Sequence, residues 1–237
     1  MAIQGPQAGS RPPIRTAPGR RCPSHPEHPP PMKLYYAPGA CSMGIHILLE
    51  EIGAPYEAVK LDIRGGESQR PPFNTLNPKG KVPTLQRDDG SVITEYPVIA
   101  TYLARTNPAA NLLPTDPEAE LRGAEAMDYC VATLHMQGFS RMFRPANFAP
   151  SEADHDAVKA RGREIQERGY ALLDHQLAGK DWIAGSYSMA DSAVFYVTYW
   201  GAKRMGMALP PNLAAHFARM MARPAVQRMI AREGLAD

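Results

Sequence analysis

Between residues 32 and 105, stretches in which apolar residues recur at the spacing of a β-strand alternate with stretches at the spacing of an α-helix. The pattern therefore predicts strands that alternate with helices. Residues 33–36 form a short β-prone run that ends at Pro38 and Gly39. A helical period follows, with an apolar face made of Ile45, Leu48, Leu49 and Ile52. Gly53 is typical of a helix C-terminus. A second strand is predicted where apolar and polar residues alternate, at Val59, Leu61 and Ile63.

A β-hairpin and a further helix complete this first region. The segments 82–86 and 91–94 are β-prone, and Asp89-Gly90 between them is a strong signal for a tight turn. Pro97 suits the first turn of a helix whose buried face holds Ile99, Tyr102 and Leu103. The predicted order is βαβ, an irregular link and then ββα. That order is typical of a thioredoxin-like domain, in which a small mixed sheet carries helices on both faces.

In the rest of the chain, apolar residues recur only at the spacing of an α-helix. Residues 107–117 hold three prolines and are predicted to be a linker. Two long helices are expected next, with inward faces made of Met127, Val131, Leu134 and Gly138 and of Val158, Ile165, Leu172, Leu173 and Leu177. Ser188 and Asp191 form a variant capping box before a buried helix. The sequence therefore predicts an α+β thioredoxin-like domain over residues 32–106 and an all-α domain over residues 118–237.

Residues 1–31 differ in composition from everything that follows. They hold nine prolines and four arginines against one glutamate, with few large apolar residues, so we expect a disordered and dispensable extension. The remaining 206 residues carry 22 basic and 23 acidic side chains, which gives no electrostatic basis for binding nucleic acid. Apolar runs are too short to span a membrane.

Cysteine and histidine spacing narrows the chemistry further. Cys22, Cys41 and Cys130 form no CxxC pair and no disulfide framework, which favours a reducing compartment such as the cytoplasm. The seven histidines show no ligand spacing, so no metal is predicted.

Cys41 is the first candidate for chemistry, because it stands just past a strand and at the start of a helix. Unpaired backbone N–H groups and the positive end of the helix dipole meet at such a place. They favour a thiolate, and the pKa of a cysteine there can fall from about 8.5 into roughly the 3.5–7.5 range. The alternative is a buried structural cysteine.

A second candidate site combines Pro83 with Glu95. A cis bond before Pro83 would turn the backbone of Val82 outward, so that its N–H and C=O can pair with an extended peptide. Glu95 precedes a helix start, where it can accept from a ligand ammonium while the helix N–H groups hold a carboxylate. The alternative for Glu95 is a plain acidic residue at a helix start.

These motifs together resemble the cytosolic glutathione S-transferase superfamily, and most of all its bacterial beta class. The resemblance runs from residue 32 to residue 234. It rests on Lys33-Leu-Tyr-Tyr-Ala-Pro-Gly-Ala-Cys41-Ser, Asn77-Pro-Lys-Gly-Lys-Val-Pro83, Thr94-Glu95, Trp182-Ile-Ala-Gly185 with Ser188-Met-Ala-Asp191, and Arg223-Pro-Ala-Val226.

The resemblance implies a homodimer that uses glutathione as cosubstrate and holds a small hydrophobic electrophile between its domains. By matching positions, Cys41 would face the glutathione sulfur, with Ala40 and Ser42 beside it. Val82, next to a cis Pro83, would pair with the cysteinyl backbone of glutathione. Glu95 and the backbone N–H of Tyr96 would hold the γ-glutamyl end.

Two positions depart from the family pattern. Residue 96 is Tyr where the family usually has Ser or Gly, so a hydroxyl ligand is lost and a ring is expected to crowd the γ-glutamyl site. Beta-class members often carry His-Lys-Gly early in the helical domain, whereas here His135 lies one residue further from Gly138. On an α-helix that extra residue rotates His135 by about 100° relative to the glycine.

Three functions fit this sequence. The first is a detoxifying transferase that ionises glutathione and adds its sulfur to a soft electrophile. The second is glutathione-dependent thiol–disulfide exchange or peroxidase chemistry through a mixed disulfide on Cys41. The third is a binding module that kept the fold and lost turnover.

Overall fold

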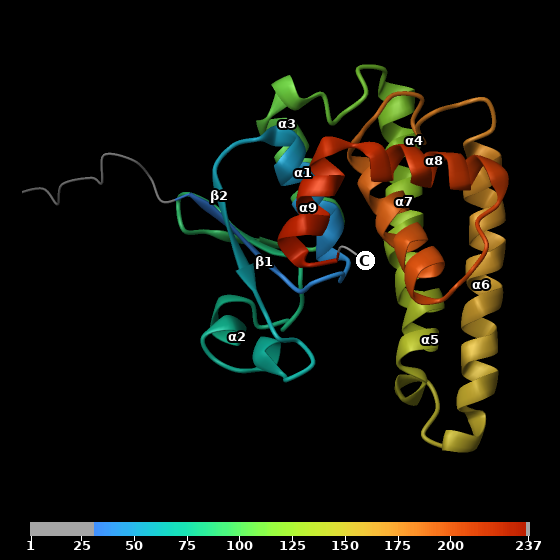
Figure 1. Ribbon diagram of the computed structural model, residues 1–237. Helices are drawn as coiled ribbons and strands as arrows, with labels where there is room; N and C mark the ends of the chain where they lie inside the picture. Colours follow the sequence, from blue (N-terminus) through green and yellow to red (C-terminus); the bar gives the residue numbers. More distant parts are fainter. Residues whose placement is uncertain (1–30, 236–237) are drawn as a thin grey trace, which may run out of the picture.

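A computed structural model describes residues 31–235 of the chain (Figure 1). The expected extension lies outside the described residues except for Pro31, and so does Cys22. In Figure 1 a small sheet with its helices forms one side of the molecule, and the rod from α4 to α5 together with the long helix α6 forms the other. The predicted combination of a thioredoxin-like domain with an all-α domain is confirmed.

The sheet has four strands in the order β2-β1-β3-β4. Its central strand β1 (Met32–Tyr36) runs parallel to β2 (Tyr56–Lys60) and antiparallel to β3 (Thr84–Gln86). The hairpin partner of β3 is β4 (Val92–Thr94), and the register pairs Leu85 with Ile93. This mixed sheet is the one that the βαβ–ββα order predicts.

Two strands begin or end away from the predicted positions. β2 covers Tyr56–Lys60 and leaves out Leu61 and Ile63. The extended chain ends there because Asp62 begins a turn, with its carboxylate accepting from the N–H of Gly65 at 2.8 Å. β3 begins only after Pro83, which has no N–H to give to the sheet.

Two helices pack on the sheet as predicted. α1 (Ser42–Ile52) has a buried apolar face, and Gly53 ends it in the left-handed conformation that glycine tolerates, with φ of 70°. α3 (Tyr96–Thr106) buries Ile99 and Leu103, while Tyr102 is only partly buried. The short helix α2 (Phe73–Leu76) lies in the link between β2 and β3.

The helical domain begins with one continuous rod. α4 (Pro117–Asp128) passes without a break into the π-helix η3 (Tyr129–Phe139) and then into α5 (Ser140–Phe143). α6 (His155–Gln176) runs beside this rod (Figure 1). The inward face of α6 differs from the predicted one, because Leu172 is 42% exposed and Gly162, Gln166 and Gly169 are buried instead.

Of the last helices, α7 lies in the core of the helical domain, and α9 packs against the first domain. α7 (Met189–Tyr199) is buried along its whole length and continues into a second π-helix, η6 (Trp200–Arg204). α8 (Pro211–Ala222) and α9 (Pro224–Glu233) follow, and Figure 1 shows α9 beside α1. Arg228 on α9 donates to the Glu50 carboxylate of α1 at 2.7 Å. Among the described residues, no helix is both long and apolar enough to cross a membrane.

The predicted capping box at the start of α7 is present. The Ser188 hydroxyl accepts from the helix backbone, and the Asp191 carboxylate accepts from the N–H of Ser188 at 2.9 Å. Asp191 does more than cap, because it also accepts from the N–H of Ile183 and from the His216 ring, each at 2.9 Å. All of these groups are buried, so one carboxylate joins α7, α8 and the loop before them.

Candidate functional site

The structure brings together Cys41 and Val82, two residues that the family resemblance assigns to different parts of bound glutathione. Cys41 is the N-cap residue of α1, and its thiol donates to the Val82 carbonyl with an Sγ–O distance of 3.5 Å. The Val82–Pro83 peptide bond is cis, and Pro71–Pro72 is a second cis bond that we did not predict. The start of α1 and the segment that leads into β3 are therefore in contact through the Cys41 sulfur atom.

The expected low pKa of Cys41 is wrong for this structure. Burial raises the pKa of the Cys41 thiol to about 12, and the nearby Glu233 carboxylate adds to this. Backbone N–H groups of Cys41 and Ser42 and the charge of Lys81 lower the pKa by less. The helix start therefore acts as predicted, but desolvation by the surrounding protein outweighs it. Cys41 is a neutral thiol near pH 7.

The loop that leads into α1 is held in place by hydrogen bonds to the helical domain. Gly39 adopts a φ of +64°, its N–H donates to Glu233 Oε2 at 2.7 Å, and its carbonyl accepts from Trp200 Nε1 at 2.8 Å. Glu233 also bonds to Nδ1 of the buried His46 at 2.8 Å. Ala40 closes the turn through its N–H to the Ala37 carbonyl. The position of Cys41 thus depends on residues almost 200 positions away.

Ser42 lies next to Cys41 but is engaged elsewhere. Its side chain is fully buried, and its hydroxyl lies 3.3 Å from the N–H and 3.4 Å from the carbonyl oxygen of Ala37. The hydroxyl closes the turn before α1.

Glu95 stands at the entrance to α3 with a positive φ of 70°, which is uncommon for a residue with a side chain. Its carboxylate is exposed and accepts from Lys79 Nζ at 2.6 Å, and the same ammonium donates to Thr94 Oγ1 at 2.8 Å. The first N–H groups of α3 follow directly, and they have no partner within the helix. A carboxylate and helix N–H groups therefore lie side by side, with Lys79 as a neighbour that we did not predict.

Tyr96 does not crowd this place, contrary to expectation. Its side chain is buried between the two domains, where its hydroxyl lies 2.7 Å from Ser192 Oγ on α7. Gly44 on α1 makes room for it, since a Cβ there would lie 2.1 Å from the Tyr96 hydroxyl oxygen. The ring thus packs between α1, α3 and α7. Only the backbone of residue 96 remains at the helix start where the γ-glutamyl end was expected.

Tyr96→Phe tests this placement of the ring. We expect the variant to lose about 1 kcal/mol of unfolding free energy, because a buried hydrogen bond to Ser192 is removed. Glutathione affinity should stay within about twofold, because the ring lies away from the helix start. Urea denaturation and calorimetric titration measure the two effects. A large loss of affinity with unchanged stability would place the hydroxyl in the ligand site instead.

His135 is placed by the π-helix. An extra residue in an α-helix can be absorbed as a π-helical turn, which leaves the flanking helices in register. The π-helix η3 contains both His135 and Gly138, and because a π-helix has more residues per turn, the extra residue rotates His135 by less than the predicted rotation of about 100°. The Leu134 carbonyl accepts from the buried Gln166 side chain on α6. Gly138 and Gly162 allow this close approach, because a Cβ on Gly162 would lie 2.7 Å from the Gly138 carbonyl oxygen.

The His135 ring belongs to an aromatic wall between the domains. It packs edge-on against Trp200 with centroids 4.8 Å apart and against Tyr196 at 5.9 Å. Tyr196 in turn contacts the Tyr96 ring at 5.3 Å. Burial, with smaller contributions from the charges of Arg144 and Lys81, lowers the pKa of His135 to about 4. His135 is therefore a neutral ring near pH 7, able to share one N–H.

Comparison with known proteins decides the family. Residues 39–106 match the model "Glutathione S-transferase, N-terminal domain", and residues 131–224 match "Glutathione S-transferase, C-terminal domain". Glutathione S-transferase GstA of Escherichia coli O157:H7 is 34% identical over 208 residues, which cover 86% of this chain and all of that protein. The chain belongs to the glutathione S-transferase family.

Solved structures agree with this assignment. A sphingomonad glutathione S-transferase complexed with glutathione is 35% identical, with a TM-score of 0.75, over 86% of this chain and all of the other. The bacterial beta class enzyme of Sphingomonas chungbukensis is 32% identical, with a TM-score of 0.74 and the same coverage. The expected beta class and the expected transferase are thereby confirmed.

Several polar groups of the transferase's cleft were missed by the sequence analysis. Lys79 and Lys81 both precede the predicted Val82, and the quoted motif contained both without a role for either. Trp200 and Glu233 hold the Cys41 loop from the helical domain. Arg204 lies beside Gly39, where an added Cβ would be 2.1 Å from its Nη2. Such contacts join distant parts of the chain, so no local pattern marks them.

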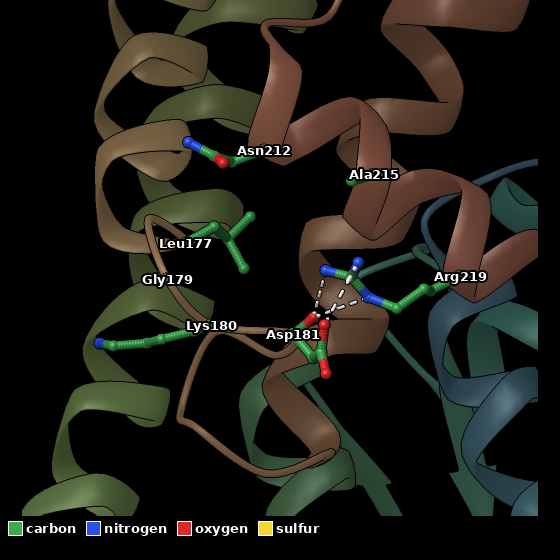
Figure 2. A pocket seen from close by; sticks show the side chains of 7 residues that line it. All are labelled: Leu177, Gly179, Lys180, Asp181, Asn212, Ala215 and Arg219. Carbon is green, nitrogen blue, oxygen red and sulfur yellow. Dashed lines mark hydrogen bonds and ion pairs between the residues drawn. The ribbon is translucent and has the colours of Figure 1, made fainter.

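The transferase has a separate cavity of about 290 Å³ in the helical domain (Figure 2). It lies between the end of α6 and α8, and its lining includes neither Cys41 nor any other predicted site residue. Arg219 Nη2 donates to the Asp181 carbonyl at 2.8 Å, and Arg219 also pairs with the Asp181 carboxylate, as Figure 2 shows. The Arg219 guanidinium is therefore already paired with Asp181. Within residues 31–235 no three potential ligand side chains gather to hold a metal ion.

Proposed function

We propose that this transferase binds glutathione between the starts of α1 and α3, ionises its thiol and adds the sulfur to a soft electrophile. The observation that carries the proposal is the meeting of Cys41 with Val82 at the start of α1, at 3.5 Å. An extended peptide that pairs with the Val82 backbone has its sulfur next to that helix start. The first turn of α3 and Glu95 then receive the γ-glutamyl end.

The glycine carboxylate of glutathione needs a cation at the opposite end. Arg204 lies beside Gly39 with an exposed side chain, and partial desolvation lowers its pKa together with the charge of Arg64. In the part of the chain that the structure describes, neither arginine forms an ion pair with a carboxylate. We therefore assign the glycine end to Arg64 and Arg204.

Ionisation of the glutathione thiol follows from the helix start. The N–H groups at the beginning of α1 and the positive end of its dipole stabilise a sulfur anion. The neutral Cys41 thiol and one N–H of His135 are further donors. The nucleophile in this proposal is the glutathione sulfur, since the Cys41 thiol keeps its proton near pH 7. Thiol exchange through Cys41 is the second candidate, favoured by the place of its sulfur beside the Val82 backbone.

We also propose a cytoplasmic homodimer with a detoxifying role. Val98 on α3 and Leu121 on α4 are the two most exposed of the large apolar side chains in the described residues, at 53% and 59%. A second copy is the partner that the family suggests for this face. The described cysteines, Cys41 and Cys130, are free thiols, as expected in a reducing compartment.

The γ-glutamyl assignment has a direct test in Glu95→Gln. We expect the dissociation constant for glutathione, measured by calorimetric titration, to rise about tenfold, because a charge-assisted hydrogen bond to the ligand ammonium is lost. Glu57→Gln is the matched control, since Glu57 forms an exposed pair with Lys33 at 2.7 Å on the far strand β2. Its affinity should stay within about twofold. A wild-type protein that does not bind millimolar glutathione contradicts the proposed function.

A further inference from the structure

Lys79 lies at the place where the proposed function puts the γ-glutamyl end of glutathione. Its ammonium donates to Glu95 Oε1 at 2.6 Å and to Thr94 Oγ1 at 2.8 Å. Thr94 is the last residue of β4, and Glu95 is the N-cap residue of α3. Lys79 itself comes from the link between α2 and β3. Two side-chain contacts therefore hold a cation at the start of α3.

The backbone of Lys79 is held in place as well. Its N–H donates to Oδ1 of Asn77 at 3.1 Å. Asn77 is almost fully buried, and its Nδ2 donates to Thr84 Oγ1 at 2.8 Å. Gly80 follows with a φ of +62°, and its carbonyl accepts from Gln69 Nε2 at 2.9 Å. The Lys79 side chain thus starts from a fixed turn, while its ammonium end is open to a ligand from solvent.

The start of α3 offers a carboxylate fewer donors than most helix starts do. Pro97 lies in the first turn and has no N–H to give. The Tyr96 hydroxyl is used elsewhere, because it lies 2.7 Å from Ser192 Oγ on α7. The N–H groups of Tyr96 and Val98 are left without a partner in the helix. A carboxylate accepts about four hydrogen bonds, so one bound here has room for further donors.

Lys79 and Thr94 each have a donor to spare. An ammonium has three N–H groups, and the contacts with Glu95 and Thr94 use two of them. The Thr94 hydroxyl accepts from Lys79 and keeps its own O–H to donate. On the acidic side, the Glu95 carboxylate is engaged within residues 31–235 only through Oε1. One N–H, one O–H and one carboxylate oxygen are thus left around the same contact.

We propose that Lys79 and Thr94 bind the α-carboxylate of the γ-glutamyl residue, while the second oxygen of Glu95 binds its ammonium. The proposal rests on the proposed function and adds two specificity-determining residues to it. Positive and negative charges then alternate around a ring made of Lys79, Glu95, the ligand ammonium and the ligand carboxylate. Such a ring is complementary to a free α-amino acid, and a peptide that lacks either charged group loses part of it.

The alternative is that Lys79 only occupies the place of the ligand ammonium. Glutathione would then have to displace it from Glu95, and Lys79 would weaken binding. The second oxygen of Glu95 argues against displacement, because a carboxylate can accept from two ammonium groups at once. The two models predict opposite effects on glutathione affinity when the lysine is removed.

An analogue of glutathione without the α-carboxylate tests the assignment. In 4-aminobutanoyl-cysteinylglycine the ammonium and the rest of the peptide are kept. We measure Kd for this analogue and for glutathione by calorimetric titration, and the ratio of the first Kd to the second reports the contribution of the carboxylate. The ratio should exceed about ten in the wild type, and Lys79→Met should lower it about tenfold, because a charge-assisted hydrogen bond is lost.

Further variants separate the contributions. Thr94→Val keeps the shape of the side chain and removes the hydroxyl, so the ratio should fall about threefold. Lys79→Arg retains the charge and should keep most of the ratio. Lys33→Met is the matched control, because Lys33 forms a surface pair with Glu57 at 2.7 Å on β1 and β2. It should leave the ratio within about twofold of the wild type.

The ratio cancels any effect that a variant has on the rest of the glutathione site, so it isolates the α-carboxylate. A wild-type ratio near one, or a Lys79→Met ratio within about twofold of the wild type, overturns this proposal alone. Tighter binding of both ligands by Lys79→Met, with an unchanged ratio, would show that Lys79 only competes with the ligand ammonium. A wild-type protein that binds no glutathione in calorimetry overturns the proposed function together with this proposal.

Discussion

Asp191→Ala is expected to lower the free energy of unfolding by about 3–5 kcal/mol, as removal of one partner from a buried charged network does. The Asp191 carboxylate is fully buried and accepts from His216 Nε2, from the N–H of Ile183 and from the N–H of Ser188, each at 2.9 Å. Alanine leaves all three donors without an acceptor inside the protein. The three segments they belong to then lose their common anchor.

Denaturation in urea measures this loss, and Ser188→Ala is the matched control. Ser188 caps the same helix but serves only the first turn of α7, so its loss should cost about 1 kcal/mol. If Asp191→Ala costs no more than Ser188→Ala, the carboxylate is a simple cap and the contacts with His216 and Ile183 contribute little. Far-ultraviolet circular dichroism confirms that both variants still fold.

Features set by neighbours in sequence were predictable. The stop of α1 at Gly53, the hairpin at Asp89-Gly90 and the capping box at Ser188 each depend on a few adjacent residues, and all three are present. The family resemblance assigned both Cys41 and Val82 to the glutathione site. Their direct contact was not predicted, because the two residues come from separate elements.

Features set by packing between distant elements were not predictable. The π-helix η3 depends on Gln166 and Gly162 of α6, which lie opposite Leu134 and Gly138. The direction of the Tyr96 ring depends on the space left by Gly44. In each case the sequence shows which residue is present but not which residues of other elements pack against it. The Tyr96 ring, for example, was expected to crowd the γ-glutamyl site, but the structure places it elsewhere.

The pKa of Cys41 belongs to this second group and has a consequence for mechanism. A helix start lowers a thiol pKa, but the local sequence does not report that elements from the rest of the chain cover the sulfur. Burial raises the pKa to about 12. Alkylation of Cys41 by iodoacetamide should therefore be slower at pH 7 than that of free cysteine, and should rise about tenfold per pH unit toward that pKa.

Cys41→Ala separates the two chemistries. Conjugation should fall by no more than about tenfold, because the nucleophile is the glutathione sulfur and only one weak S–H donor is lost. Disulfide exchange, measured with hydroxyethyl disulfide and glutathione, should fall at least about a thousandfold if Cys41 carries a covalent intermediate. Both assays use the same protein and the same glutathione site, so a misfolded variant would lose both.

Cys130→Ala controls for the loss of a thiol as such. Cys130 is fully buried at the start of η3, and burial also raises the pKa of its thiol, so neither activity should depend on it. A Cys41→Ala variant that binds glutathione normally, yet loses conjugation and exchange in parallel, would mean that Cys41 takes part directly in both reactions. The proposed order, in which glutathione is the nucleophile and Cys41 a neutral donor beside it, would then be wrong. Retention of conjugation is the outcome that a protonated Cys41 thiol next to the Val82 backbone predicts, and loss of exchange in the same variant would support the second candidate function.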